Sequence, residues 1–310
     1  MIVTVTMNPA IDKTVEIEML QQGGLNRISK IEYDVGGKGI NVSKTIHELG
    51  GESIATGFLA GNTGRTIENV LNEKGIKNDF IWVKGETRTN TKVFEKSGMV
   101  TELNEPGPVP TKEELELLMK KLEQYAAPDT LFVLAGSVPK GMDTDIYAQI
   151  IELVHRKGAK VLLDADGDLF RSALVATPDI IKPNSIELEE YAGFDYKASE
   201  DELIQVARDL LNKGISMVAV SMGRRGAIML KKDYCAKCDA LSVKAHSTVG
   251  AGDAMVAALS YACEKGMDED ETLKLSIATS AGAVTTVGTK PPSRELVMRL
   301  KDDVVITKID

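Results

Sequence analysis

Short apolar runs alternate with helical patterns along most of the chain, and this rhythm restricts the folds that it can adopt. Runs typical of buried strands occupy residues 2–6, 54–59, 131–135, 161–164 and 217–221. Helical patterns occupy 40–49, 66–74 and 145–157, each closed by a glycine, and the capping boxes that begin at Thr111 and Ser199 predict two more helices. We therefore predict an α/β fold with a doubly wound, mostly parallel sheet flanked by helices.

Two segments break the rhythm, at about 13–35 and 89–103, where short alternating runs are joined by polar turns and not by helices. We predict that they form a small separate β-sheet. Insertions of this kind commonly cover an active site, so the small sheet is a candidate lid on a single domain of residues 1–310. An ordinary edge meander is the alternative.

Composition excludes several classes of function. The net charge is −9 and no long basic block offsets it, which argues against nucleic-acid binding. No run approaches the roughly 18 apolar residues of a membrane span. Cys235 and Cys238 are the one close cysteine pair, and they lack the further ligands of a closed zinc site. We expect a soluble cytoplasmic protein with reduced thiols.

The most informative segment is 247–253, where Gly250, Ala251 and Gly252 precede Asp253 and an apolar helical run. Free backbone N–H groups and the positive end of a helix dipole bind anions such as a phosphoryl group. A carboxylate beside that anion can take the proton of an attacking hydroxyl. Alternatively, Asp253 only caps its helix. A dinucleotide site is disfavoured, because Met255 occupies the place of the third glycine in that fingerprint.

Three other segments carry polar or glycine-rich patterns with two interpretations each. Residues 36–41 are rich in glycine, which allows a ligand close to the backbone or makes a tight turn, and they do not form a Walker A loop. Asn184 and Glu187 form a capping box, or they direct hard oxygen ligands toward Mg²⁺. Residues 221–226 make a hairpin or admit a nucleotide.

In combination, four motifs resemble those of the ribokinase-like PfkB carbohydrate kinases, in the family's order and over nearly the whole chain. They are Gly36-Gly37-Lys38-Gly39-x-Asn41, Lys182-x-Asn184-x-x-Glu187, Ser221-x-Gly223-x-x-Gly226 and residues 248–253. Segments 6–12, 87–90 and 101–107 are similar to the phosphosugar branch, which includes the 1-phosphofructokinases and tagatose-6-phosphate kinases. The resemblance implies an ATP- and Mg²⁺-dependent kinase for fructose 1-phosphate, with tagatose 6-phosphate and fructose 6-phosphate as alternatives. A non-catalytic sugar-phosphate sensor is the alternative from another class.

The resemblance also implies a role for each matching residue. The groups that would hold sugar hydroxyls are Asp12, Gly37 and Asn41, and those around the sugar's phosphate are Arg27, Lys38, Arg88 and Ser137. Asp253 would be the base and Gly250, Ala251 and Gly252 the anion hole. The nucleotide site would use Lys182, Asn184, Ser221, Gly223, Gly226 and Ser280, and Asn184 with Glu187 would organise Mg²⁺. Ser280 is a departure, since many members have asparagine there. Exposed edges of the lid sheet suggest a homodimer.

Overall fold

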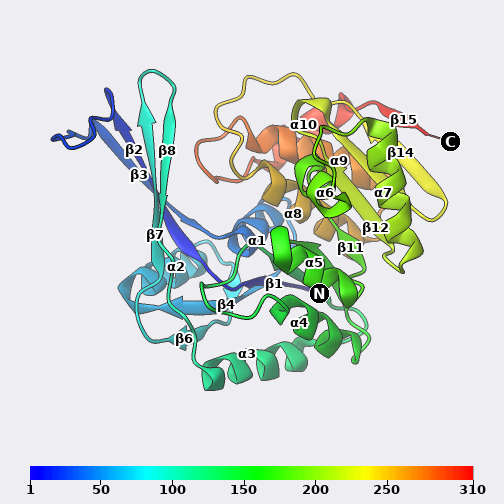
Figure 1. Ribbon diagram of the computed structural model, residues 1–310, viewed down its shortest axis with the longest axis horizontal. Helices are drawn as coiled ribbons and strands as arrows, with labels where there is room; N and C mark the ends of the chain where they lie inside the picture. The colour runs from blue at the N-terminus through cyan, green and yellow to red at the C-terminus, as the bar shows by residue number, and fades with distance from the viewer. Residues whose placement is uncertain (310) are drawn as a thin grey trace.

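The computed structural model describes residues 1–309 and contains two β-sheets of very different size (Figure 1). The large sheet has eleven strands in the order β15-β14-β13-β12-β11-β10-β9-β1-β4-β5, and β6 also pairs with β4. Its strands are β1 Ile2–Thr6, β4 Ile54–Ala60, β5 Lys77–Asn78, β6 Ile81–Val83, β9 Leu131–Ala135, β10 Lys160–Asp164, β11 Ile180–Ile181, β12 Met217–Ser221, β13 Ala227–Lys231, β14 Tyr234–Cys238 and β15 Ile306–Lys308. All pairs from β5 to β12 are parallel, and those among β12 to β15 are antiparallel.

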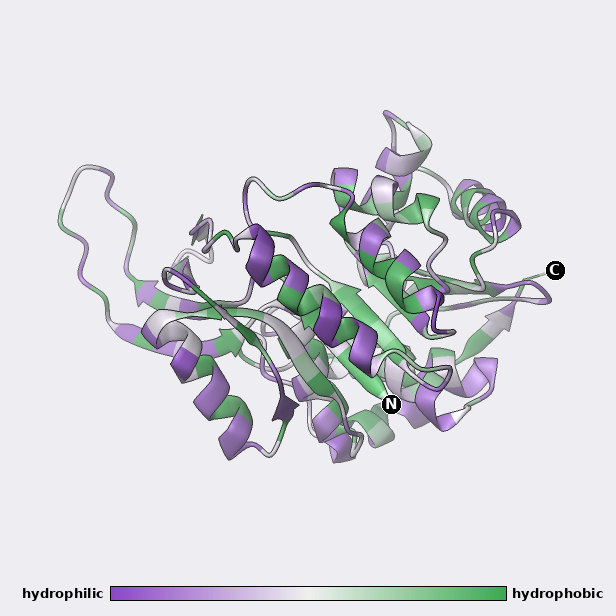
Figure 2. Cartoon of the chain, turned by 90° about the horizontal axis from the view of Figure 1, so that it is seen from below, coloured by the Kyte–Doolittle hydropathy of each residue, from purple (hydrophilic) through white to green (hydrophobic). Residues whose placement is uncertain are grey.

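Helices cover both faces of the large sheet. One face carries α3 Lys112–Tyr125, α4 Ile146–His155, α5 Gly167–Val175, α6 Ser185–Ala192 and α7 Glu200–Asn212. The other carries α1 Lys38–Glu48, α8 Ala251–Lys265, α9 Glu269–Ala283 and α10 Arg294–Asp302. Side chains alternate between the two cores, since Phe132 and Leu134 of β9 join the first and Leu131 and Val133 join the second. Figure 2 shows these apolar strands between helices with hydrophilic outer faces. The predicted doubly wound fold is confirmed.

The second sheet has four strands in the order β3-β2-β7-β8 and projects from the rest of the molecule (Figure 1, left). Its strands are β2 Ala10–Ile17, β3 Lys30–Gly36, β7 Arg88–Glu95 and β8 Val100–Asn104. Strand β2 is antiparallel to β3 and parallel to β7, and β7 is antiparallel to β8. The predicted small sheet is therefore present, with strands that begin and end a few residues outside the predicted segments.

Some elements differ from the sequence-based expectation. Helix α2 Gly61–Glu73 begins five residues before the predicted 66–74, because the carboxylate of Glu86 accepts the N–H of Thr63 and satisfies the first turn. Helices α5 and α10 were not predicted. The hairpin interpretation of residues 221–226 is confirmed by antiparallel pairing of β12 with β13. A Cβ at Gly226 would lie 1.9 Å from the carbonyl oxygen of Cys238, so only glycine fits there.

Residues 1–309 contain no helix that is both long enough and apolar enough to span a membrane.

Candidate active site

Several of the predicted site residues lie at the carboxyl edge of the large sheet, whose strand order reverses at β1. Strand β1 is flanked by β4 on one side and by β9 on the other, and later strands continue outward from β9. Loops at such a switch point diverge and leave a crevice for ligands. Asp164 is the last residue of β10, Lys182 follows β11 directly, and Ser221 ends β12. The sheet topology thus brings these three residues to one edge.

Asp253 lies in the first turn of α8 and does not cap it. The N-cap is Gly250, whose left-handed backbone (φ 82°) turns the chain into the helix without any side-chain cap. Asp253 is only 8% exposed, and its Oδ2 accepts a 2.8 Å hydrogen bond from Asn41 Nδ2 of α1. The capping alternative is therefore wrong. Asn41 and Asp253 are 212 residues apart in the sequence, and the fold brings them together.

Burial raises the pKa of Asp253 to about 6, and the neighbouring Asp164 carboxylate adds to the effect. Lys38, the hydrogen bond from Asn41 and Lys182 act in the opposite direction. The result is a carboxylate that is mostly ionised at neutral pH and basic enough to accept a proton in the same range. These are the properties that a general base requires.

Asp164 is a site residue that the sequence analysis missed. Its side chain is buried, and its two oxygens lie 3.4 Å from Lys38 Nζ and 3.2 Å from Lys182 Nζ. Burial would raise the pKa of Asp164, but the two ammonium groups hold it below its usual value. A Cβ at Gly252 would lie 3.6 Å from Lys182 Nζ, so this cation borders the glycine loop. The sequence offered one signal for Asp164 as a site residue: it is an acidic residue directly after the apolar run 161–163.

One face of the small sheet carries a row of polar side chains. Ala10, Asp12 and Thr14 of β2 pair in register with Arg88, Asn90 and Lys92 of β7, and alternate residues share a face. Asn90 is the in-register neighbour of Asp12 and helps to lower the pKa of its carboxyl group, and Lys92 Nζ lies 4.0 Å from that carboxylate. Burial raises the pKa of Asp12, while Lys92 and Lys44 oppose the rise. Asp12 and Arg88 were predicted as site residues from the sequence, whereas Asn90 and Lys92 were not.

Arg88 is held at the base of the small sheet by backbone carbonyls. Its guanidinium donates to the oxygen of Asn8 at 3.0 Å and to that of Glu105 at 3.4 Å. Its Nε is buried and has no partner among residues 1–309. Gly37 lies nearby with φ 104°, and a Cβ there would lie 2.7 Å from Thr6 Cγ2. Glycine is therefore required, which keeps the start of α1 close to the end of β1.

At the end of β12, Asn184 forms an isolated parallel bridge with Ser221, and Gly223 begins a short 3₁₀ turn that ends at Arg225. Asn184 and Glu187 form a complete capping box, with Asn184 Oδ1 accepting from the N–H of Glu187 and Glu187 Oε2 accepting from that of Asn184. The structural interpretation of this pair is confirmed. Across residues 1–309, no three His, Cys, Asp or Glu side chains gather as metal ligands.

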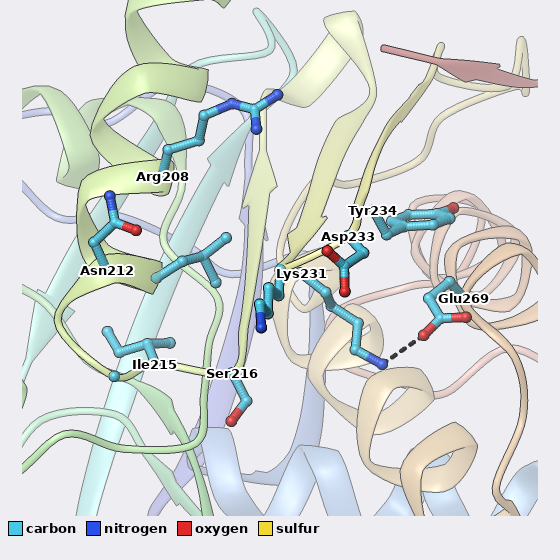
Figure 3. Close-up of a pocket in the computed structure, with 11 residues that line it drawn as sticks. Arg208, Asn212, Ile215, Ser216, Lys231, Asp233, Tyr234 and Glu269 are labelled. Atoms are coloured by element: carbon cyan, nitrogen blue, oxygen red, sulfur yellow. Dashed lines mark hydrogen bonds and ion pairs between the residues drawn. The ribbon is translucent and has the colours of Figure 1, made fainter. Parts of the chain in front are cut away.

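Three predicted residues lie outside these contacts. Ser137 is exposed just after β9, and Ser280 is half-buried on α9. Arg27 is exposed in the loop 18–29 between β2 and β3, and in the described part of the chain its guanidinium makes no hydrogen bond or ion pair. A separate hollow of about 920 Å³ between α7, β13 and β14 contains none of the predicted residues (Figure 3). Its Lys231 pairs with Glu269 at 2.6 Å.

A model of the pfkB family of carbohydrate kinases matches residues 4–296. The chain belongs to the pfkB family. It is 33% identical to a 1-phosphofructokinase of Vibrio cholerae, over 99% of this kinase and 97% of that protein. It is 37% identical to a 1-phosphofructokinase of Borreliella burgdorferi, over 93% and 92% of the two chains. The predicted family is thus confirmed, and this kinase is an ATP-dependent sugar kinase.

Solved structures of pfkB-type kinases share the fold. A phosphofructokinase structure from Staphylococcus aureus, described as putative, has a TM-score of 0.87 at 34% identity and covers 100% of this kinase and 99% of that chain. Phosphofructokinase-2 from Escherichia coli in complex with potassium has a TM-score of 0.92 at 26% identity, with 97% and 98% covered.

Proposed function

We propose that this kinase transfers the γ-phosphoryl group of ATP to the C6 hydroxyl of fructose 1-phosphate, giving fructose 1,6-bisphosphate. The observation that carries the chemistry is the buried carboxylate of Asp253. It lies at a glycine-lined helix start, and its pKa is raised to about 6. The substrate rests on the curated relatives named 1-phosphofructokinase, which are 33–37% identical over nearly the full length.

In this proposal, Asp253 orients the acceptor hydroxyl and takes its proton as the new O–P bond forms. The hydrogen bond that Asn41 donates to Asp253 Oδ2 fixes the orientation of the carboxylate, so that the other oxygen would face the substrate. N–H groups of Gly250, Ala251 and Gly252 would stabilise charge that develops on the transferred phosphoryl group. Lys182, held in place by Asp164, would add a positive charge at the same point.

Mg²⁺ fits the same edge of the sheet. Glu187 uses only one carboxylate oxygen in its capping box, and its pKa is raised by burial in spite of the N–H of Asn184. Carboxylate and amide oxygens are the ligands that Mg²⁺ prefers, often through water. Glu187 and Asn184 would therefore hold the ion, which neutralises charge on the nucleotide phosphates when bound. Ser221, Gly223, Gly226 and Ser280 would line the rest of the nucleotide site.

At the sugar end, Asp12, Asn41 and Gly37 would bind ring hydroxyls. Arg88, Lys38 and Ser137 would surround the sugar's phosphate, and Arg27 stays a predicted fourth group. A guanidinium suits this task because it can donate two parallel hydrogen bonds to a phosphate. The unpartnered Nε of Arg88 supports this role, since a buried donor without a partner is costly unless a ligand satisfies it.

The small sheet would act as the lid of a single kinase domain and as a dimer interface. Its face opposite Asp12 exposes Ile31, Tyr33 and Leu103, which are 45%, 64% and 59% exposed. Exposed apolar side chains that gather on one sheet face favour a protein partner, here a second copy of the chain. Light scattering should give the mass of a dimer, and a monomeric mass would contradict this part of the proposal.

The deciding experiment compares kcat/KM for fructose 1-phosphate, tagatose 6-phosphate and fructose 6-phosphate with ATP. A ketohexose furanose carries a CH₂O group at each end, so a phosphate clamp alone accepts all three sugars. Choice must come from ring hydroxyls near Asp12 and Asn41, where an unpaired buried group costs about 1–3 kcal/mol. We expect fructose 1-phosphate to be preferred. A tenfold preference for either other sugar would assign the chain to a different activity within the family.

A further inference from the structure

Lys44 is a buried cation on α1 that the proposed transfer does not use. It lies three residues after Asn41, so the two side chains share one side of the helix, and it is only 2% exposed. Its Nζ lies 3.2 Å from Asp34 Oδ1 and donates to the carbonyl oxygen of Val35 at 2.6 Å. An ammonium group is costly to bury, so a buried lysine with two fixed partners calls for a reason.

The partners of Lys44 belong to the small sheet and lead on to the glycine loop. Asp34 and Val35 are near the end of β3, where the chain leaves the small sheet for α1. The other oxygen of Asp34 accepts a 2.7 Å bond from the hydroxyl of Thr289. Thr289 in turn packs against the glycine loop 250–252, because a Cβ at Gly250 would lie 3.5 Å from Thr289 Cα. One chain of contacts therefore joins α1, the small sheet and the glycine loop.

Both carboxylates of the substrate site lie in the field of Lys44. Burial lowers the pKa of Lys44, and Asp34, Asp12 and Asp253 oppose that effect. Asp12 also faces Lys92 and Arg88 of β7 and Asp34 of β3. The other charges that act on Asp253 come from Asp164 of β10, from Lys38 of α1 and from Lys182 after β11. Lys44 is therefore positioned behind the site, with carboxylates from three elements around it.

We propose that Lys44 is a positioning residue for phosphoryl transfer: through Asp34 and Thr289 it fixes the small sheet and the glycine loop against α1. This role rests on the proposed function. With these contacts in place, Asp12 on the small sheet and Asp253 at the glycine loop keep one separation across the sugar. Without them, the two ends of the substrate site can shift relative to each other, and small displacements of reacting groups are costly in rate.

The test uses Lys44→Met and Thr289→Val, with Lys121→Met as a matched control. Lys121 of α3 is a partly buried lysine whose partner is Asp79, and neither residue is among the described site residues. Steady-state kinetics are measured for each variant with the sugar phosphate that the wild type uses best, across pH 5 to 9. Thermal melting accompanies each measurement.

For Lys44→Met we expect the sugar KM to rise about tenfold, with a lower kcat. The acid limb of kcat/KM should move up by about half a pH unit or more, because the lost positive charge favoured the ionised carboxylates. Thr289→Val removes one hydroxyl and should raise the sugar KM in the same direction by a smaller factor. Lys121→Met should lose stability only.

Wild-type kinetics and pH profile in both Lys44→Met and Thr289→Val would refute the positioning role, as would a loss of stability alone. If Lys44→Met does not fold, Thr289→Val decides the matter by itself. Wild-type enzyme without turnover on any of the three sugar phosphates would refute the proposed function instead, so the two failures are distinguishable.

Discussion

Asp253→Asn removes a buried negative charge and keeps the size of the side chain. The bond from Asn41 can also persist, because the new amide oxygen can accept it. The variant should lose kcat by about 10²–10⁴-fold, the usual effect of losing a general base. The same substitution should make the folded kinase more stable at neutral pH, since the ionised carboxylate is costly to bury.

The size and sign of that gain follow from the pKa. The folded state raises the pKa of Asp253 from 3.8 to about 6, so between these values the folded protein binds more protons than the unfolded chain. Wild-type stability is therefore favoured below pH 3.8 and lost as the pH rises through 6. About two pKa units correspond to a cost of about 3 kcal/mol above pH 7, and roughly half of it is already present at pH 5.

Urea unfolding of the wild type and the variant at pH 5 and pH 8 measures this difference directly. The gain in the free energy of unfolding should be larger at pH 8 than at pH 5 by about 1.5 kcal/mol. A variant that is less stable than the wild type at pH 8, or a difference in stability that does not change with pH, would show that Asp253 is not a buried base with a raised pKa.

Four other substitutions test the site and the fold. Lys38→Met should move the acid limb of kcat/KM above pH 6, because Lys38 lowers the pKa of Asp253, and a pH–rate profile would detect this. Arg88→Ala should raise the sugar-phosphate KM by tenfold or more with little change in the KM for ATP, as initial rates would show, since about 1.4 kcal/mol is a factor of ten. Glu187→Gln should raise the Mg²⁺ concentration for half-maximal activity with little loss of stability, because glutamine can still accept the N–H of Asn184; an unchanged Mg²⁺ titration would leave Glu187 a capping residue only. Gly226→Ala should lower the melting temperature strongly, because its φ is 83° and its Cβ would overlap the carbonyl of Cys238.

Local patterns predicted the fold well because most elements carry their own signals. The run 131–135 is apolar on both faces, as a central parallel strand must be, and the capping boxes at Thr111 and Ser199 mark real helix starts. The start of α2 was missed because its first turn is satisfied by Glu86, which comes from a distant part of the chain. No periodicity within residues 61–73 carries that information.

Most of the predicted site residues lie in the motifs that carry the family resemblance. Asp164, Asn90, Lys92 and Lys44 were missed, although each is partly or fully buried. The partners of Asp164 and Lys92 come from other strands or helices, so no short segment shows an acid beside a base. Conversely, the capping box explains the pattern of Asn184 and Glu187 completely from local sequence. The structure adds one observation in favour of Mg²⁺, namely that only one carboxylate oxygen of Glu187 is used in the capping box.

Arg88 also sits where the small sheet joins the rest of the molecule. Four connections cross that junction, and the guanidinium of Arg88, itself the first residue of β7, ties the one that contains Asn8 to the one that contains Glu105. A ligand that displaces the guanidinium therefore also acts on these two connections. With the small sheet as the proposed lid, binding of the sugar phosphate and closure of the lid are coupled, and hydrogen exchange at residues 7–9 and 105–110 should slow when the sugar phosphate binds, even without ATP.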